Sequence, residues 1–138
     1  MQPDLDILRR HQEAAIGVLT RAVDCLDQGP AAVLAASAEL RREFDEILGA
    51  YQIFKHERVF DPAIGSGDEH RAALARHMKV GCIAAGEVFR AYMSRWTVDQ
   101  IASDWVHYRP AARLTVNQLR RHIVAEREGI VELIETYG

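Results

Sequence analysis

The feature that most constrains this chain is a spacing of apolar residues at intervals of three and four, which recurs in four long segments. This spacing is typical of helices that bury one face, and no segment shows the alternation of a half-buried strand. Gly29-Pro30 separates the first two segments, a loop around Pro62 follows the second, and Pro110 introduces the last. Short links between long amphipathic helices favour antiparallel neighbours. The sequence therefore predicts an all-α fold, an up-down-up-down antiparallel four-helix bundle.

The helix bounds follow from start and stop signals. Ser66 followed by Glu69 is a capping-box pattern for the third long helix, and Thr97 with Gln100 is a second such start. The expected long helices cover residues 3–28, 30–60, 69–95 and about 110–138, with a short extra helix over 97–107.

Length and composition limit the possible classes of protein. The 138 residues suffice for one domain, spanning 1–138, and the hydrophobic share of 49% is ordinary for a globular protein. The net charge of −3 gives no electrostatic basis for binding nucleic acid or an anionic membrane. No apolar run approaches the ~20 residues that span a bilayer, and the N-terminal segment lacks a signal-peptide core. We expect a cytoplasmic protein.

The remaining chemistry-bearing residues favour a binding protein over an enzyme. Cys25 and Cys82 lie far apart among apolar residues, so we expect both to be reduced and buried. No Ser-His-Asp or Cys-His arrangement, phosphate loop or nucleotide fingerprint is visible. No sequence motif therefore supports a hydrolase or a nucleotide-dependent enzyme.

Histidines gather toward one end of the predicted bundle, on all four long helices. Five of the six lie there: His11, His56, His70, His77 and His122. Each shares a face with apolar residues; His70 and His77, for example, lie on a line with Leu74 and Val88. A single inward histidine is more often a hydrogen-bonded core residue than a ligand. The pattern leaves a metal site and a polar core both open.

A carboxylate joins these histidines in the last helix. His122 and Glu126 are four residues apart, so one turn of helix can place a nitrogen and an oxygen on one ion. Several imidazoles and a carboxylate that converge inside a bundle are the ligands expected of iron or a similar divalent metal.

This arrangement resembles the hemerythrin-like, or HHE cation-binding, domains, and the resemblance runs from His11 to Glu126. Members of that family are four-helix bundles that hold a pair of non-haem iron ions. His11 matches the first ligand of the family. Glu69-His70 matches the pair that opens the third helix, with His70 as the ligand. His122 and Glu126 match the H-x3-E motif of the last helix.

The second helix departs from the family's motif. The segment VFDPAI matches the proline-containing exit of that helix, and Pro62 fixes the register. Gln52 then stands where the family has histidine and His56 where it has the carboxylate, while Glu57 keeps the acidic residue that follows. A register that pairs His56 with Asp61 restores a carboxylate but breaks the alignment at Pro62. The resemblance leaves a ligand set that suits one ion better than two: His11, His56, His70, His122 and Glu126.

Four further residues are expected near the metal. Glu57 and His77 are additional candidate ligands, although His77 lies two turns beyond the matched histidine of its helix. Gln52 is expected to orient His56 by a hydrogen bond. Tyr51 or Gln52 is expected to donate a hydrogen bond to bound oxygen.

The resemblance implies a non-haem iron protein that binds or senses O2, NO or peroxide, with one or two ions. If it holds no metal, the same bundle is expected to act as a protein-interaction or regulatory module. Aromatic residues over 96–108 are then either its docking surface or a cap on the core. A diiron peroxidase or catalase-like enzyme is a third possibility, which the missing carboxylate at His56 disfavours.

Overall fold

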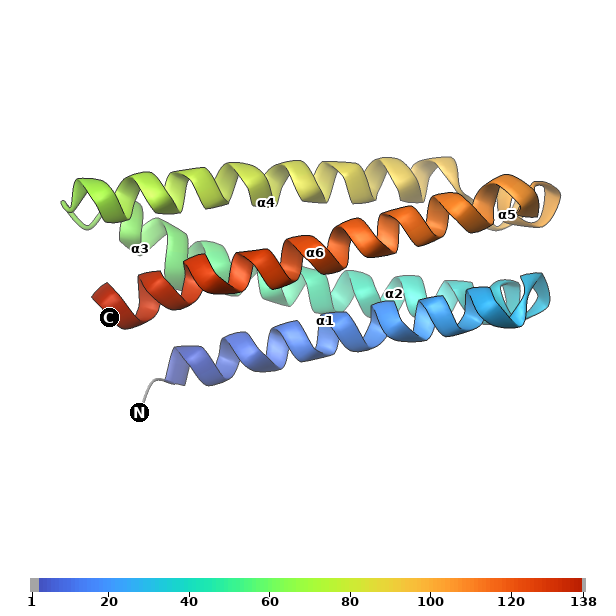
Figure 1. Ribbon diagram of the computed structural model, residues 1–138, viewed down its shortest axis with the longest axis horizontal. Helices are drawn as coiled ribbons and strands as arrows, with labels where there is room; N and C mark the ends of the chain where they lie inside the picture. Colours follow the sequence, from blue (N-terminus) through green and yellow to red (C-terminus); the bar gives the residue numbers. More distant parts are fainter. Residues whose placement is uncertain (1–2, 138) are drawn as a thin grey trace.

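The computed structural model describes residues 3–137, with the backbone alone at 136 and 137. Its long helices are α1 (Pro3–Gln28), α2 (Pro30–Phe54), α4 (Glu69–Arg95) and α6 (Trp105–Tyr137). They alternate in direction, so that both ends of the chain lie at the same end of the molecule (Figure 1). All regular structure in the described part of the chain is helical. The all-α prediction is therefore confirmed.

Two helix starts agree with the sequence signals. Gly29 has a φ of 107°, in the left-handed region that glycine adopts without steric cost, and Pro30 begins α2. The short helix α5 (Val98–Ser103) follows Thr97, whose side chain accepts a hydrogen bond from the backbone N of Gln100 at 3.3 Å. This helix ends at residue 103 rather than the expected 107.

Two other starts differ from the prediction. Asp68, not Ser66, caps α4, because its carboxylate accepts a hydrogen bond from the backbone N of Arg71 at 2.9 Å. The Ser66 hydroxyl instead donates to a carbonyl of the preceding turn at 2.7 Å. The last helix begins at Trp105, and Pro110 lies inside it. As the sixth residue of α6, Pro110 lies beyond the first four N–H groups, so its missing N–H removes one hydrogen bond of the helix.

A short π-helix continues α2 toward the loop before α4. It is η1 (Lys55–Phe60), and α3 (Asp61–Ile64) follows it, where the sequence predicts one α-helix through residue 60. Hydrogen bonds of a π-helix span five residues instead of four, so the turn is wider. Lys55 is buried here, whereas His56 is half-buried. The bundle interior thus receives a lysine rather than a histidine from this segment.

Aromatic residues close the end of the bundle opposite the chain ends. Trp96 and Tyr108 are 4% and 6% exposed, and Trp105 packs against the same cluster. Trp96 and Tyr108 therefore belong to the core at this end of the bundle, whereas Trp105 is half-buried beside them. Between residues 3 and 137, no helix combines the length and the apolar character needed to cross a bilayer.

Candidate functional site

The structure brings some of the predicted ligands together. His122 and Glu126 meet on α6, with Nε2 of the histidine 3.3 Å from Oε2 of the carboxylate. His56 lies across the bundle, and its Nε2 is 3.9 Å from the sulfur of Cys82 on α4. His11 stacks its ring on a tyrosine of α2, with centroids 5.7 Å apart. These three histidines are each half-buried.

Three other predicted residues lie outside this group. His70, His77 and Glu57 are exposed. The prediction that both α4 histidines face the interior is wrong, because the line through Val88 points to solvent and Val88 is 51% exposed. The residues that α4 buries are Ala72, Ala75 and Cys82. In the part of the chain that the structure describes, no three His, Cys, Asp or Glu side chains are arranged to hold a metal ion.

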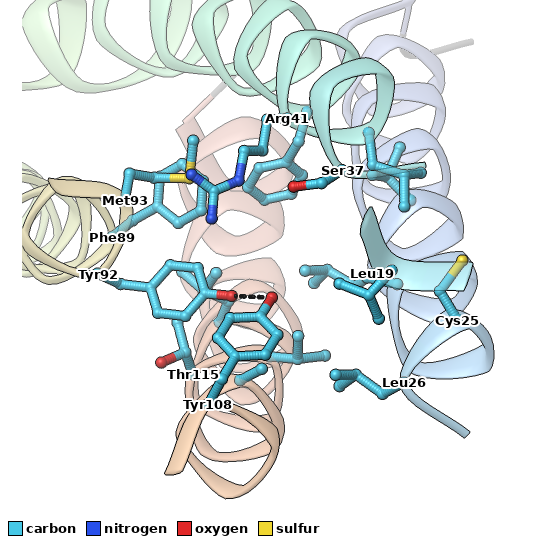
Figure 2. A pocket seen from close by; sticks show the side chains of 18 residues that line it. Leu19, Cys25, Leu26, Ser37, Arg41, Phe89, Tyr92, Met93, Tyr108 and Thr115 are labelled. Carbon is cyan, nitrogen blue, oxygen red and sulfur yellow. Dashed lines mark hydrogen bonds between the residues drawn. The ribbon is translucent and has the colours of Figure 1, made fainter. Parts of the chain in front are cut away.

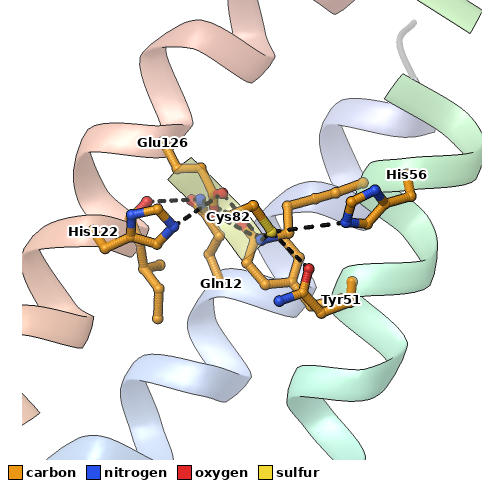
Figure 3. A network of polar contacts seen from close by, with 9 residues as sticks. Gln12, Tyr51, His56, Cys82, His122 and Glu126 are labelled. Atoms are coloured by element: carbon orange, nitrogen blue, oxygen red, sulfur yellow. Dashed lines mark hydrogen bonds and ion pairs between the residues drawn. The ribbon is translucent and has the colours of Figure 1, made fainter. Parts of the chain in front are cut away.

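Figure 3 shows the polar network around Glu126. A buried lysine, Lys55, pairs with this carboxylate. Nζ of Lys55 lies 3.0 Å from both carboxylate oxygens of Glu126, and each side chain is 2% exposed. The same nitrogen lies 4.1 Å from the ring centre of Tyr51, a cation–π contact. The two charges are therefore paired and removed from water together.

Tyr51 and Gln12 complete the hydrogen bonding of this carboxylate. The Tyr51 hydroxyl donates to Oε1 of Glu126 at 2.7 Å. Nε2 of Gln12 donates to the Tyr51 oxygen at 2.9 Å and to the backbone carbonyl of Ile123 at 3.0 Å. A continuous chain of buried hydrogen bonds thus links α1, α2 and α6.

Cys82 extends the network to α4. Its sulfur accepts a hydrogen bond from Nζ of Lys55 at 3.1 Å, and its thiol donates to Oε1 of Gln52 at 2.7 Å. Gln52, expected to orient His56, is thus engaged with the cysteine. Figure 3 shows Cys82 between the α6 carboxylate and His56.

The contacts set the charge of Glu126. Burial raises the pKa of this carboxyl, but the nearby His122 ring, Lys55 and Tyr51 outweigh it, so the pKa lies below its usual value. Nε2 of His122 lies 3.3 Å from Oε2 of Glu126, but the two atoms are not in hydrogen-bond geometry. The histidine therefore affects the carboxylate by being close to it and not through a formed hydrogen bond. Burial and the adjacent carboxylate raise the pKa of Tyr51. At neutral pH the centre therefore holds an ionised carboxylate and a neutral phenol.

Two of the neighbouring imidazoles, those of His11 and His56, are neutral at the same pH. Burial lowers the pKa of His11. Burial, with the positive charges of Lys79 and Lys55, lowers the pKa of His56. The ammonium of Lys55, 3.0 Å from the carboxylate, therefore pairs with Glu126 without the need for a protonated histidine.

These residues, as placed, do not fit the iron that the resemblance implies. The Lys55 ammonium lies where a cation would sit beside Glu126, and the two carboxylate oxygens already accept three hydrogen bonds. A second cation 4 Å from an ammonium meets a repulsion of about 4 kcal/mol per pair of unit charges, at an effective dielectric constant of about 20. The exposed His70 contributes nothing to this centre.

Three members of the network are absent from the sequence-based prediction, namely Lys55, Gln12 and Cys82. The sequence held a signal for the lysine, because Lys55 ends a stripe of buried and half-buried residues with the three- and four-residue spacing of a helix. That stripe consists of Phe44, Leu48, Tyr51 and Lys55. No comparable local signal distinguishes Gln12 or Cys82 from other residues on their helices.

An apolar cavity of about 90 Å3 lies toward the other end of the bundle, between all four long helices (Figure 2). Tyr92 of α4 and Tyr108 of α6 form one side of it, with their hydroxyl oxygens 2.8 Å apart. Burial, with the neighbouring Tyr108, raises the pKa of Tyr92. Most of the lining is apolar, including Leu19, Leu26, Phe44, Val116 and Leu119.

Arg41 of α2 extends its guanidinium toward the tyrosine pair (Figure 2). One terminal nitrogen donates a hydrogen bond to the backbone carbonyl of Trp96. The side chain is half-buried, and it forms no ion pair with a carboxylate of the described residues. Among the residues that the structure describes, Arg41 is therefore a cation without a counterion at the border of an apolar cavity.

Comparisons with known proteins assign no family to the chain. No protein-family model matches it, and searches of curated proteins and of solved structures find no significant match. The function is therefore inferred from the two sites themselves.

Proposed function

We propose that this chain is a hemerythrin-like bundle that works without iron and binds a small organic acid, as a ligand-responsive regulatory module. The ligand carries a carboxylate and an apolar tail of about three or four carbon atoms. The tail fills the apolar cavity, and the carboxylate lies between Arg41 and the Tyr92–Tyr108 pair. The regulatory signal is then the binding of a carboxylate to the guanidinium of Arg41, and not the binding of oxygen to a metal.

The observation that supports this most is the half-buried Arg41 beside an apolar cavity. A guanidinium presents five N–H donors in a planar fork, and the carbonyl of Trp96 uses one of its nitrogens. A carboxylate accepts two parallel hydrogen bonds from such a fork. The reduced dielectric constant of a half-buried position strengthens that pairing.

The tyrosine pair supplies a further donor. Each hydroxyl has one hydrogen, and one of the two is used in the 2.8 Å bond between Tyr92 and Tyr108. The other hydrogen is available to a carboxylate oxygen as long as both phenols stay neutral. The raised pKa of Tyr92 keeps that phenol neutral at physiological pH.

The cavity volume sets the size of the tail. An apolar cavity of about 150 Å3 takes a benzene molecule, so a cavity of about 90 Å3 takes about three or four carbon atoms. An empty cavity of this volume costs about 2 kcal/mol of stability, at about 24 cal/mol per Å3. A ligand that fills it recovers part of that cost.

The chemistry of the lining favours binding over catalysis. The ionisable side chains that line the cavity are Cys25, Arg41, Tyr92 and Tyr108, without a histidine or a carboxylate. General acid–base catalysis near neutral pH needs a group whose pKa lies there. The cavity therefore holds its ligand without transforming it.

Calorimetric titration with butyrate and isovalerate tests the proposal. We expect saturable binding by the wild-type chain, and at least about a tenfold loss of affinity in Arg41→Gln, because hydrogen bonds to charged groups contribute about 1.5–3 kcal/mol. The matched control is Arg42→Gln, since Arg42 is exposed and pairs with Glu46 at 2.9 Å. Butanol, which has the tail without the carboxylate, should bind at least about tenfold more weakly than butyrate.

Two results would contradict the proposal. One is the absence of saturable binding of any short carboxylate by the folded wild-type chain. The other is equal affinity of wild type and Arg41→Gln, which would place the binding site elsewhere.

A further inference from the structure

We propose that Lys55 and Cys82 are an oxidation-sensitive pair, which hydrogen peroxide joins through a nitrogen–sulfur bond. Nζ of Lys55 lies 3.1 Å from Sγ of Cys82, and the two side chains come from η1 and α4. They are 2% and 1% exposed. Neither residue lines the organic-acid cavity, so this inference does not rest on the function proposed above.

A small cavity beside the pair has room for the oxidant. Its volume is about 20 Å3, enough for one water-sized molecule. Hydrogen peroxide has only one oxygen atom more than water, so we take it as the oxidant. The polar and reactive side chains that line it are Tyr51, Gln52, Lys55, Cys82, His122 and Glu126.

In the first step, the sulfur of Cys82 attacks one oxygen of the peroxide. A sulfur–oxygen bond forms and the oxygen–oxygen bond breaks. The thiol proton leaves with the second oxygen as water, and His56, with its Nε2 3.9 Å from the sulfur, is placed to relay that proton. The sulfur is oxidised by two electrons to a sulfenic acid, and the peroxide is reduced.

In the second step, the nitrogen of Lys55 attacks the same sulfur. The ammonium first transfers a proton to Glu126, whose oxygens lie 3.0 Å away. A nitrogen–sulfur bond forms while the sulfur–oxygen bond breaks. The departing hydroxide takes a second proton from the nitrogen and leaves as water. One peroxide is consumed, two waters form, and the pair loses two hydrogen atoms besides the proton held by Glu126.

The product differs from the reduced state in charge and in connectivity. Glu126 loses its ion-pair partner and keeps the transferred proton. A covalent bond now ties η1 to α4. A thiol reductant attacks the sulfur, breaks the nitrogen–sulfur bond and restores the amine, so the change is reversible.

The composition of the chain makes this product easy to identify. Only two lysines and two cysteines are present. Lys79 pairs with Asp61 at 2.8 Å, and Cys25 lines the apolar cavity. Other lysine–cysteine combinations therefore serve as internal controls.

Peptide mass spectrometry of the folded wild-type chain after peroxide treatment tests the inference. We expect a linked pair of peptides containing Lys55 and Cys82, lighter than the two free peptides by two hydrogen atoms and separated by dithiothreitol. Cys25→Ser should keep the link and Cys82→Ser should lose it. Lys55→Arg keeps the positive charge but has no attacking amine, so Cys82 should proceed there to sulfinic acid.

Three outcomes of the wild-type experiment alone would overturn the inference. One is Cys82 oxidised to sulfenic or sulfinic acid while Lys55 stays free. Another is an unreacted Cys82 at peroxide levels that oxidise Cys25. The third is an equal yield of the link in wild type unfolded by urea, where the 3.1 Å contact no longer exists.

Discussion

Nζ of Lys55 lies 3.0 Å from each carboxylate oxygen of Glu126, in the interior of the bundle. The lysine comes from η1 and the glutamate from α6, so the ion pair joins two segments 71 residues apart in sequence. The free energy of desolvating two buried charges offsets much of their electrostatic attraction. Removal of one partner, however, leaves an uncompensated buried charge. Each charge is therefore tolerated in the interior only while its partner is present.

Removal of the ammonium should be strongly destabilising. Lys55→Met leaves Glu126 buried without its cation, and we expect the free energy of unfolding to fall by about 3–5 kcal/mol. Lys55→Met combined with Glu126→Gln removes both charges and keeps an acceptor for Tyr51, so it should recover at least half of that loss. Urea unfolding of the two single variants and the double variant measures the coupling.

Lys79→Met is the matched control for that series. Lys79 pairs with Asp61 at 2.8 Å in a more exposed position, so its loss should change the free energy of unfolding by less than about 1 kcal/mol. Equal effects of the two lysine substitutions would show that the buried pair has no special role in stability.

Stability should fall as the pH drops below neutral. The folded chain holds the pKa values of His11 and His56 below the ordinary histidine value of 6.5. The unfolded chain therefore binds protons first, and the free energy of unfolding decreases as the pH falls through about 6.5. Urea unfolding at a series of pH values measures this. A free energy that stays constant or rises between neutral pH and about 5 would contradict it.

Protonation of Glu126 should cause a second loss of stability at acidic pH. Its pKa in the folded chain lies below the ordinary glutamate value of 4.5, so its stabilising effect is complete above that pH and disappears as the pH falls through the folded value. Glu126→Gln has no such group, so its unfolding free energy should depend less on pH below about 4.5. Parallel acid profiles of the variant and the wild type would count against a depressed pKa at this residue.

A larger side chain that fills the apolar cavity should abolish ligand binding and raise the stability of the folded chain. Ala22 of α1 lines the cavity, and Ala22→Leu adds three carbon atoms there. We expect the free energy of unfolding to rise by about 1 kcal/mol and butyrate binding to disappear. Ala84→Leu, on the exposed face of α4, should change neither. Undiminished binding by Ala22→Leu would place the ligand outside this cavity.

The helix starts that the sequence predicts correctly depend on local chemistry. Gly29 must adopt a positive φ, and Thr97 needs only a backbone N–H three residues away. The cap of α4 is less certain from sequence, because Ser66 and Asp68 both have acceptor side chains in the same turn. The structure resolves that competition in favour of the carboxylate.

The facing of α4 could not be predicted in the same way. This helix is rich in alanine and glycine, so two lines along it look apolar, one through Leu74 and Val88 and one through Ala75 and Cys82. Packing against the neighbouring helices buries the second line and exposes Val88. His70 and His77 therefore point to solvent, although their spacing was compatible with an inward face.

The polar centre depends on contacts between distant residues. A lysine on an apolar stripe is expected to reach solvent, and only the approach of Glu126 from α6 lets Lys55 stay inside. The sequence does predict that Glu126 faces inward with His122 beside it, and the structure places both so. What it could not indicate is that the partner of that carboxylate is an ammonium.

The iron content of the protein most directly tests whether Lys55 stands in the place of a metal ion. The measurement is elemental analysis of wild-type protein expressed with added iron and purified without oxygen. We expect no stoichiometric iron, because the ammonium of Lys55 already neutralises Glu126. One or two tightly bound iron ions per chain would contradict this and restore the iron-based function that the histidine pattern suggested.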